Sequence, residues 1–148
     1  MISTSNLNEA RKQIQKLKKE NKEIIIKAQS NEFNRKILEN KDIDIITDLE
    51  LHKRKDKLKQ RDSGLNEVLC KLASKNNIEI AINLGKIKRL DKKEKAETLA
   101  RIKQNISLCK RTNTKIIILN KESYKKQDII SFFLILKGST QQAKKSLI

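Results

Sequence analysis

Positively charged side chains are concentrated in three stretches of the sequence, 50–61, 85–95 and 120–127. The first two stretches each hold six lysines and arginines against two carboxylates, and the third holds three against one. Lysine and arginine neutralise phosphate groups, and the arginine fork donates two hydrogen bonds to one phosphate. Side chains of these types at this density predict that the chain binds a polyanion.

The whole chain carries the same imbalance of charge. Of its 148 residues, 35 are Lys or Arg and 18 are Asp or Glu, which gives a net charge of +17 and a pI near 10.0. Such a field attracts polyanions and repels other copies of the chain. Nucleic acid is the leading candidate partner, and an anionic membrane surface is the alternative.

Residues suited to catalysis or metal binding are scarce. The one histidine, His52, lies inside the first basic stretch, and no pair of histidines has the spacing of a zinc site. Four carboxylates cluster around a predicted strand: Asp42, Asp44, Asp48 and Glu50. We expect them to cap helices or to pair with lysines, and a Mg²⁺ site is the alternative. We therefore expect no catalytic residue, no metal ligand and no cofactor bound by the protein itself.

Two further features indicate where the protein works. The chain has two cysteines, Cys70 and Cys109, which is too few for the disulfide framework of a secreted protein. We expect both to act as small apolar side chains in a reduced compartment. The N-terminal residues are polar and charged, and the longest apolar stretch, 129–136, is far too short to span a bilayer. The sequence predicts a soluble, cytoplasmic protein without a membrane partner.

Strand and helix signals alternate along the chain. Apolar runs of strand length, rich in isoleucine, lie at 23–28, 42–47, 78–84 and 115–120. Helical periodicity predicts helices between these runs and two more at the end of the chain. Because strands that alternate with helices form parallel βαβ units, we expect one α/β domain over 1–148. A complete TIM barrel needs roughly 250 residues, so the expected fold is a partial TIM-barrel-like (β/α) sheet with outer helices.

Local signals predict where several of these helices begin and end. Asp62 or Ser63 is expected to cap the helix before the third strand. The apolar stripe of that helix is expected to consist of Leu65, Val68, Leu69, Leu72 and Ala73. The penultimate helix is expected to end at Gly138 in a left-handed cap, and Ser139 and Gln142 have the spacing of a capping box.

Each basic stretch is expected to be the connection that follows a strand. In a parallel sheet these connections lie at the same edge, which is where α/β folds place their sites. The three stretches would therefore form one positive face. The residues expected to contact nucleic acid on that face are Lys53, Arg54, Lys55, Lys57, Lys59, Arg61, Lys86, Lys88, Arg89, Lys125 and Lys126.

The stretch RDSGLNEVLCKLASKNNIEIAINL, residues 61–84, resembles the signature region of the ribonuclease P protein component 3 family, the archaeal and eukaryotic thirty-kilodalton subunit. The later segment LARIKQNISLCKRTNTKIIIL is similar to the helix and strand that follow in that family, and ILKGSTQQAKKSLI to its terminal helix. The match covers 42–148 well and 5–41 loosely. The family has further strands at its N-terminus, so the resemblance implies a member shortened there or a fragment of one.

The resemblance implies a TIM-barrel-like fold and membership of the ribonucleoprotein that removes 5′ leaders from precursor tRNA. In that enzyme the RNA subunit carries the chemistry with Mg²⁺, so the polypeptide itself would not be catalytic. The implied partners are ribonuclease P RNA, precursor tRNA, ribonuclease P protein component 2 and other protein subunits. Two alternatives remain: a generic nucleic-acid-binding or ribosome-associated module, and a metal-dependent phosphoesterase-like enzyme.

Overall fold

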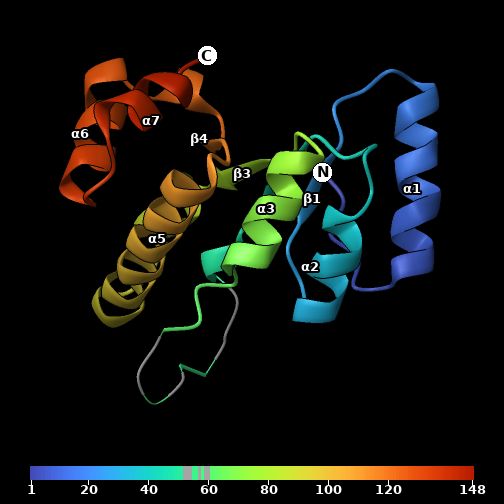
Figure 1. The fold of residues 1–148 in the computed structure, drawn as a ribbon, viewed down its shortest axis with the longest axis horizontal. Helices are drawn as coiled ribbons and strands as arrows, with labels where there is room; N and C mark the ends of the chain where they lie inside the picture. Colours follow the sequence, from blue (N-terminus) through green and yellow to red (C-terminus); the bar gives the residue numbers. More distant parts are fainter. Residues whose placement is uncertain (52–54, 57, 59–60) are drawn as a thin grey trace.

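The computed structural model of the protein describes residues 1–51, 55–56, 58 and 61–148. Its centre is a four-stranded parallel sheet in the order β1-β2-β3-β4, which is also the order along the chain. Figure 1 shows helices in front of this sheet. The strands are β1 (Ile25–Lys27), β2 (Ile45–Thr47), β3 (Glu79–Ile82) and β4 (Ile116–Ile118). Each lies inside a predicted apolar run, which confirms the α/β class and the parallel arrangement.

Isoleucines form the buried layer of the sheet. Ile26 is in register with Ile46, Ile46 with Ile80, and Ile80 with Ile116, and all four side chains are buried. Residues in register point to the same face of a sheet, so these four form one row across the strands. Burial of each side chain stabilises the fold by about 1.5–3 kcal/mol relative to exposure.

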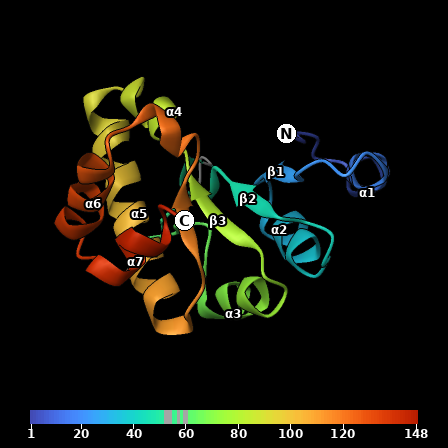
Figure 2. The same cartoon turned by 90° about the horizontal axis from the view of Figure 1, so that it is seen from above.

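Helices flank the sheet and connect its strands. They are α1 (Leu7–Lys19), α2 (Asn31–Leu38), α3 (Glu67–Lys75), α4 (Leu84–Lys88), α5 (Lys92–Thr112), α6 (Lys126–Ile135) and α7 (Thr140–Lys145), with the short 3-10 turns η1 (Leu49–Leu51) and η2 (Lys121–Ser123). Helices α2, α3 and α5 lie along one side of the sheet, and α7 packs against α6 and β4 (Figure 2). This is the expected partial TIM-barrel-like arrangement. Among the described residues, no helix is long and apolar enough to cross a membrane.

Helix α3 begins later than its sequence suggests. Its N-cap is Asn66, whose Oδ1 accepts a hydrogen bond from Leu69 N at 2.9 Å, so the expectation that Asp62 or Ser63 caps it was wrong. Asp62 Oδ1 instead accepts a hydrogen bond from Gly64 N at 3.0 Å, which closes a turn before the helix. A carboxylate engaged in its own turn is not available to cap a later helix.

The late start of α3 also changes its buried face. Val68, expected in the apolar stripe, is 67% exposed, whereas Leu69, Cys70 and Ala73 are buried. Leu65 is buried as well, but it lies ahead of the helix rather than in it. Cys70 and Cys109 are both buried free cysteines, which agrees with their expected role as small apolar side chains.

The second basic stretch is largely helical, not the plain connection that the sequence suggested. Asn83 Oδ1 accepts a hydrogen bond from Lys86 N at 3.2 Å and so caps the short helix α4. Asp91 then caps α5 by accepting a hydrogen bond from Glu94 N at 2.8 Å. Two side-chain caps therefore turn this stretch into a helix, a tight turn and the first turn of the next helix.

The end of α6 also differs in detail from the prediction. The left-handed residue after α6 is Lys137, with φ 63°, rather than Gly138. Gly138 is needed for space, because a Cβ there would lie 2.9 Å from Phe133 O. The predicted capping box is confirmed: Gln142 N donates to Ser139 Oγ and Ser139 N donates to Gln142 Oε1, both at 3.1 Å.

Candidate nucleic-acid interface

Three segments of the chain meet at the carboxyl end of the sheet. They are η1 after β2, α4 after β3, and η2 with Tyr124 after β4. Lys86 of α4 forms an ion pair with Asp48, which follows β2. Lys88 of the same helix places its Nζ 4.7 Å from the centroid of the Tyr124 ring. Helix α4 thus contacts the segments that follow both neighbouring strands, as the parallel topology requires.

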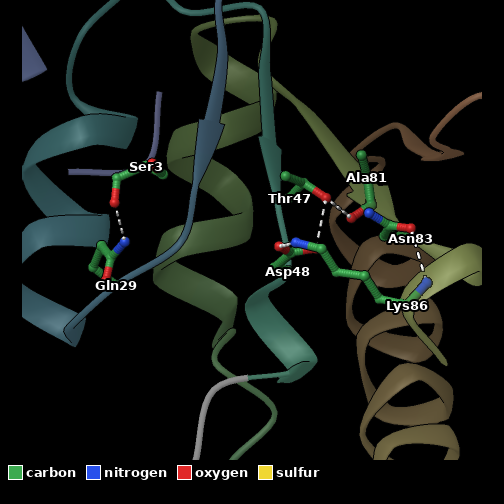
Figure 3. A network of polar contacts seen from close by, with 7 residues as sticks. All are labelled: Ser3, Gln29, Thr47, Asp48, Ala81, Asn83 and Lys86. Atoms are coloured by element: carbon green, nitrogen blue, oxygen red, sulfur yellow. Dashed lines mark hydrogen bonds and ion pairs between the residues drawn. The ribbon is translucent and has the colours of Figure 1, made fainter. Parts of the chain in front are cut away.

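A buried network anchors α4 to the sheet (Figure 3). Asp48 is 2% exposed, and its Oδ2 forms the ion pair with Lys86 Nζ. The Thr47 hydroxyl lies 3.3 Å from Asp48 Oδ1 and 3.2 Å from Ala81 O. Asn83 holds the backbone of Lys86 from the other side. Lys86 was predicted to contact nucleic acid, but its ammonium is engaged with an internal carboxylate.

A second carboxylate lies buried beside this network. Glu50 is 1% exposed, and its Oε1 has no hydrogen-bond partner in the described part of the chain. Burial raises the pKa of Glu50 to about 7, with a smaller contribution from the charge of Asp48. Lys86 and the backbone of Asn83 act in the opposite direction. Near neutral pH this carboxyl is therefore divided between its protonated and ionised forms.

The structure separates the carboxylates that offered a Mg²⁺ site. Asp42 pairs with Lys18, and Asp44 accepts a hydrogen bond from Ile24 N at 2.7 Å, before β2 begins. Asp48 and Glu50 come after β2, at the opposite end of that strand. Over the ranges that the structure describes, no three His, Cys, Asp or Glu side chains are grouped as metal ligands.

The base of the first basic stretch is tied to helix α5. Asp56 lies 3.6 Å from Arg61 Nη1 and 3.5 Å from Arg101 Nη2, and its Oδ1 accepts a hydrogen bond from Asp62 N at 2.9 Å. The backbone hydrogen bond from Asp62, followed by the charges of the two arginines, lowers the pKa of Asp56. Arg61 keeps 48% of its side chain exposed, so it pairs with Asp56 and also faces solvent.

The other predicted contact residues fall into two groups. One group is exposed and consists of Lys55, Lys88, Arg89, Lys125 and Lys126. The remaining candidates lie outside the described residues: Lys53, Arg54, Lys57 and Lys59. The structure thus supports an exposed positive surface formed by α4 and the start of α6, extended by Lys55 and Arg61.

The sequence analysis did not predict a role for two residues at this end. Arg101 lies within α5 and is 8% exposed, and nothing in its local sequence marks it as the partner of Asp56. Tyr124 carried a signal that was available, because it is the single tyrosine of the chain and lies inside the third basic stretch. An aromatic ring between lysines is a common feature of nucleic-acid-binding surfaces.

Comparisons with known proteins agree with the resemblance seen in the sequence. The model of the RNase P subunit p30 family matches residues 1–143. Ribonuclease P protein component 3 of Methanococcus vannielii is 30% identical over 117 residues, and those of Methanococcus maripaludis strain C7 and Methanocaldococcus jannaschii are each 28% identical. These alignments cover 79% of this chain and 47–48% of the relatives, so the chain spans about half their length.

A solved structure gives the same result in three dimensions. A chain of the cryo-EM structure of archaeal Ribonuclease P with mature tRNA aligns with a TM-score of 0.77 and 26% identity. The alignment covers 99% of this chain and 62% of that chain. The family match over nearly the whole sequence, the component 3 relatives and this shared fold show that the chain belongs to the RNase P subunit p30 family.

Proposed function

We propose that this chain is an RNA-binding protein subunit of ribonuclease P, which removes 5′ leaders from precursor tRNA. The observation that carries the proposal is the exposed positive surface at the carboxyl end of the sheet, in a chain of this family. Lysine and arginine side chains held there would neutralise phosphates and release counterions, which is the main source of affinity for RNA backbones.

In this proposal the protein positions RNA and leaves the chemistry to the RNA subunit with Mg²⁺. Two of the described carboxylates at this end are engaged in ion pairs, Asp48 with Lys86 and Asp56 with two arginines. Such pairs hold loops and helices in place. The partners that we propose are precursor tRNA, the ribonuclease P RNA, protein component 2 and other protein subunits, in the cytoplasm. The solved neighbour, a chain of archaeal Ribonuclease P with mature tRNA, supports RNA and protein partners in general.

The decisive experiment compares matched charge removals. A variant with Lys88→Gln, Arg89→Gln and Lys125→Gln should lose affinity for ribonuclease P RNA and show a flatter plot of log affinity against log salt. The control removes the same charge from exposed positions on α1, through Lys12→Gln, Lys16→Gln and Lys19→Gln. Equal losses in both variants would point to a generic attraction to polyanions and against a defined surface.

RNA that copurifies with the tagged chain separates this proposal from its alternative. Recovery of one structured RNA, able to cleave precursor tRNA with Mg²⁺, supports the ribonuclease P subunit. A mixture of unrelated RNAs would instead favour a generic nucleic-acid-binding or ribosome-associated module.

A further inference from the structure

An apolar cavity of about 420 Å³ lies between α4, α5 and α6. Its apolar lining consists of Leu84, Ile87, Leu99, Tyr124, Ile129 and Phe132. Pockets of this size, lined mainly by apolar and aromatic side chains with a few polar groups, are typical ligand sites. The cavity adjoins the carboxyl end of the sheet, because α4 and Tyr124 belong to both.

Positive charge borders this apolar interior. Lys88 and Lys95 line the cavity, against one carboxylate, Asp128. Lys95 Nζ donates a hydrogen bond to Lys88 O at 3.3 Å, which holds the two residues side by side. Lys125 and Lys126 come directly after Tyr124 in the chain, and both are exposed. An occupant that combines an apolar part with negative charge therefore fits this site better than a purely apolar one.

The aromatic rings of the chain support the same conclusion. Of its one tyrosine and three phenylalanines, Phe33 and Phe133 are buried in the core, at 3% and 0% exposure. Tyr124 and Phe132 are only partly buried, and both line this cavity. The Nζ of exposed Lys88 lies over the Tyr124 ring, so this π-face is accessible to a partner at the surface. Partly exposed rings beside lysines are the means by which proteins stack unpaired bases.

We propose that this cavity binds an unpaired nucleobase of RNA, stacked on Tyr124, while Lys88, Lys95 and Lys125 contact the phosphates on either side. The inference rests on the proposed RNA-binding function and adds to it the kind of RNA element that is bound. Lys88 is exposed, so it moves from the ring to a phosphate when the base enters. The base then takes the place of the Lys88 ammonium on the Tyr124 ring, and the ammonium pairs with a phosphate instead.

Tyrosine fluorescence provides a direct test on the full chain. The chain has one tyrosine and no tryptophan, so its emission reports on Tyr124 alone. The titrants are a single-stranded oligoadenylate and an abasic oligonucleotide with the same number of phosphates. We expect the oligoadenylate to quench the emission and the abasic strand to leave it nearly unchanged. Equal quenching by both strands, or binding of the oligoadenylate without quenching, would refute the base site.

Variants then test the role of the ring through the anisotropy of labelled strands. Tyr124→Leu should weaken binding of the oligoadenylate roughly 5- to 150-fold and leave the abasic strand unaffected. Tyr124→Phe keeps the π-face and should stay within about twofold of the wild type. Leu134→Ala, an exposed residue of α6 that does not line the cavity, is the control, and thermal melting verifies the fold of every variant.

The outcomes separate this inference from the proposed function. If the wild type binds neither strand nor ribonuclease P RNA, RNA binding itself is wrong. If both strands bind equally well to the wild type and to Tyr124→Leu, RNA binding stands and the base site is wrong. If the emission changes with protein concentration and not with RNA, the cavity is a contact between copies of the chain, which also overturns the inference.

Discussion

Lys86 of α4 forms an ion pair with Asp48, a carboxylate that is only 2% exposed, although 38 residues separate them in the sequence. The pair fixes the helix that carries Lys88, with Arg89 as its C-cap, to the carboxyl end of β2. The lysine side chain is 38% exposed, so water partly solvates its ammonium. The orientation of the exposed basic residues therefore depends on a contact that is mostly hidden from solvent.

Removal of this lysine should destabilise the protein. Lys86→Met leaves Asp48 buried without its cation, and we expect a loss of about 1–3 kcal/mol, below the value for a fully buried pair because Lys86 is partly solvated. Urea unfolding measures the loss. Asp48→Asn combined with Lys86→Met should recover much of it. If Lys86→Met unfolds at the wild-type urea concentration, the pair does not hold α4.

Glu50 should make stability depend on pH. Its pKa is about 7 in the folded protein against an ordinary value of 4.5, so the native state holds this proton more tightly than the unfolded state. The resulting stabilisation is fully present below pH 4.5 and is lost as the pH rises through 7, by up to about 3 kcal/mol. Glu50→Gln should remove this dependence. The measurement is the difference in unfolding free energy between wild type and variant from pH 4 to 8. A difference that stays constant over this range would contradict the raised pKa of Glu50.

Arg61 offers a test of bidentate phosphate contact. It pairs loosely with Asp56, at 3.6 Å, and remains about half exposed. Arg61→Ala should weaken RNA binding and flatten the plot of log affinity against log salt by about 0.7–0.9 if one phosphate contact is lost. Arg61→Lys should also weaken binding, because lysine lacks the guanidinium fork. Unchanged affinity and salt slope, together with a lower melting temperature, would make Arg61 a structural residue.

Two glycines should respond in opposite ways to alanine. Gly64 has φ +79°, and a Cβ there would lie 2.6 Å from Leu49 O, so Gly64→Ala should destabilise the fold by about 1–3 kcal/mol. Gly85 lies in α4, and a Cβ there would approach no atom closer than 3.4 Å. Gly85→Ala should be neutral or stabilising by up to about 1 kcal/mol. Thermal unfolding of the two variants tests this. Equal melting temperatures would show that a side chain fits at Gly64 and that the turn before α3 does not require glycine.

The isolated chain should not cleave precursor tRNA. Asp48 is paired with Lys86, and Glu50 is only 1% exposed, so neither carboxylate is positioned to activate water for attack on an RNA at the surface. Incubation with precursor tRNA and Mg²⁺, without the RNA subunit, should leave the substrate intact on a denaturing gel. Cleavage at the 5′ leader that disappears in Asp48→Asn with Glu50→Gln would show a catalytic polypeptide.

Much of the fold followed from local sequence. The isoleucine runs predicted all four strands, because a parallel sheet covered by helices needs continuous β-branched side chains. The capping box of Ser139 and Gln142 was readable for a similar reason, since its two hydrogen bonds join residues three apart. The alternation of strands and helices then predicted that the three basic stretches lie at one edge of the sheet.

The tertiary structure decided which partners the described side chains of those stretches have. Lys86 was predicted to face RNA, yet Asp48 engages it; Arg61 shares Asp56 with Arg101; and Tyr124 joins a cavity built by α4, α5 and α6. Each relationship joins residues that are far apart in the chain and are close only once the sheet has formed. Local spacing determines which hydrogen bonds a helix or turn can make, whereas the partner of a charge depends on its neighbours in space. The sequence alone therefore predicted a positive edge, and the packing of the helices decided which of its charges stay exposed to a partner.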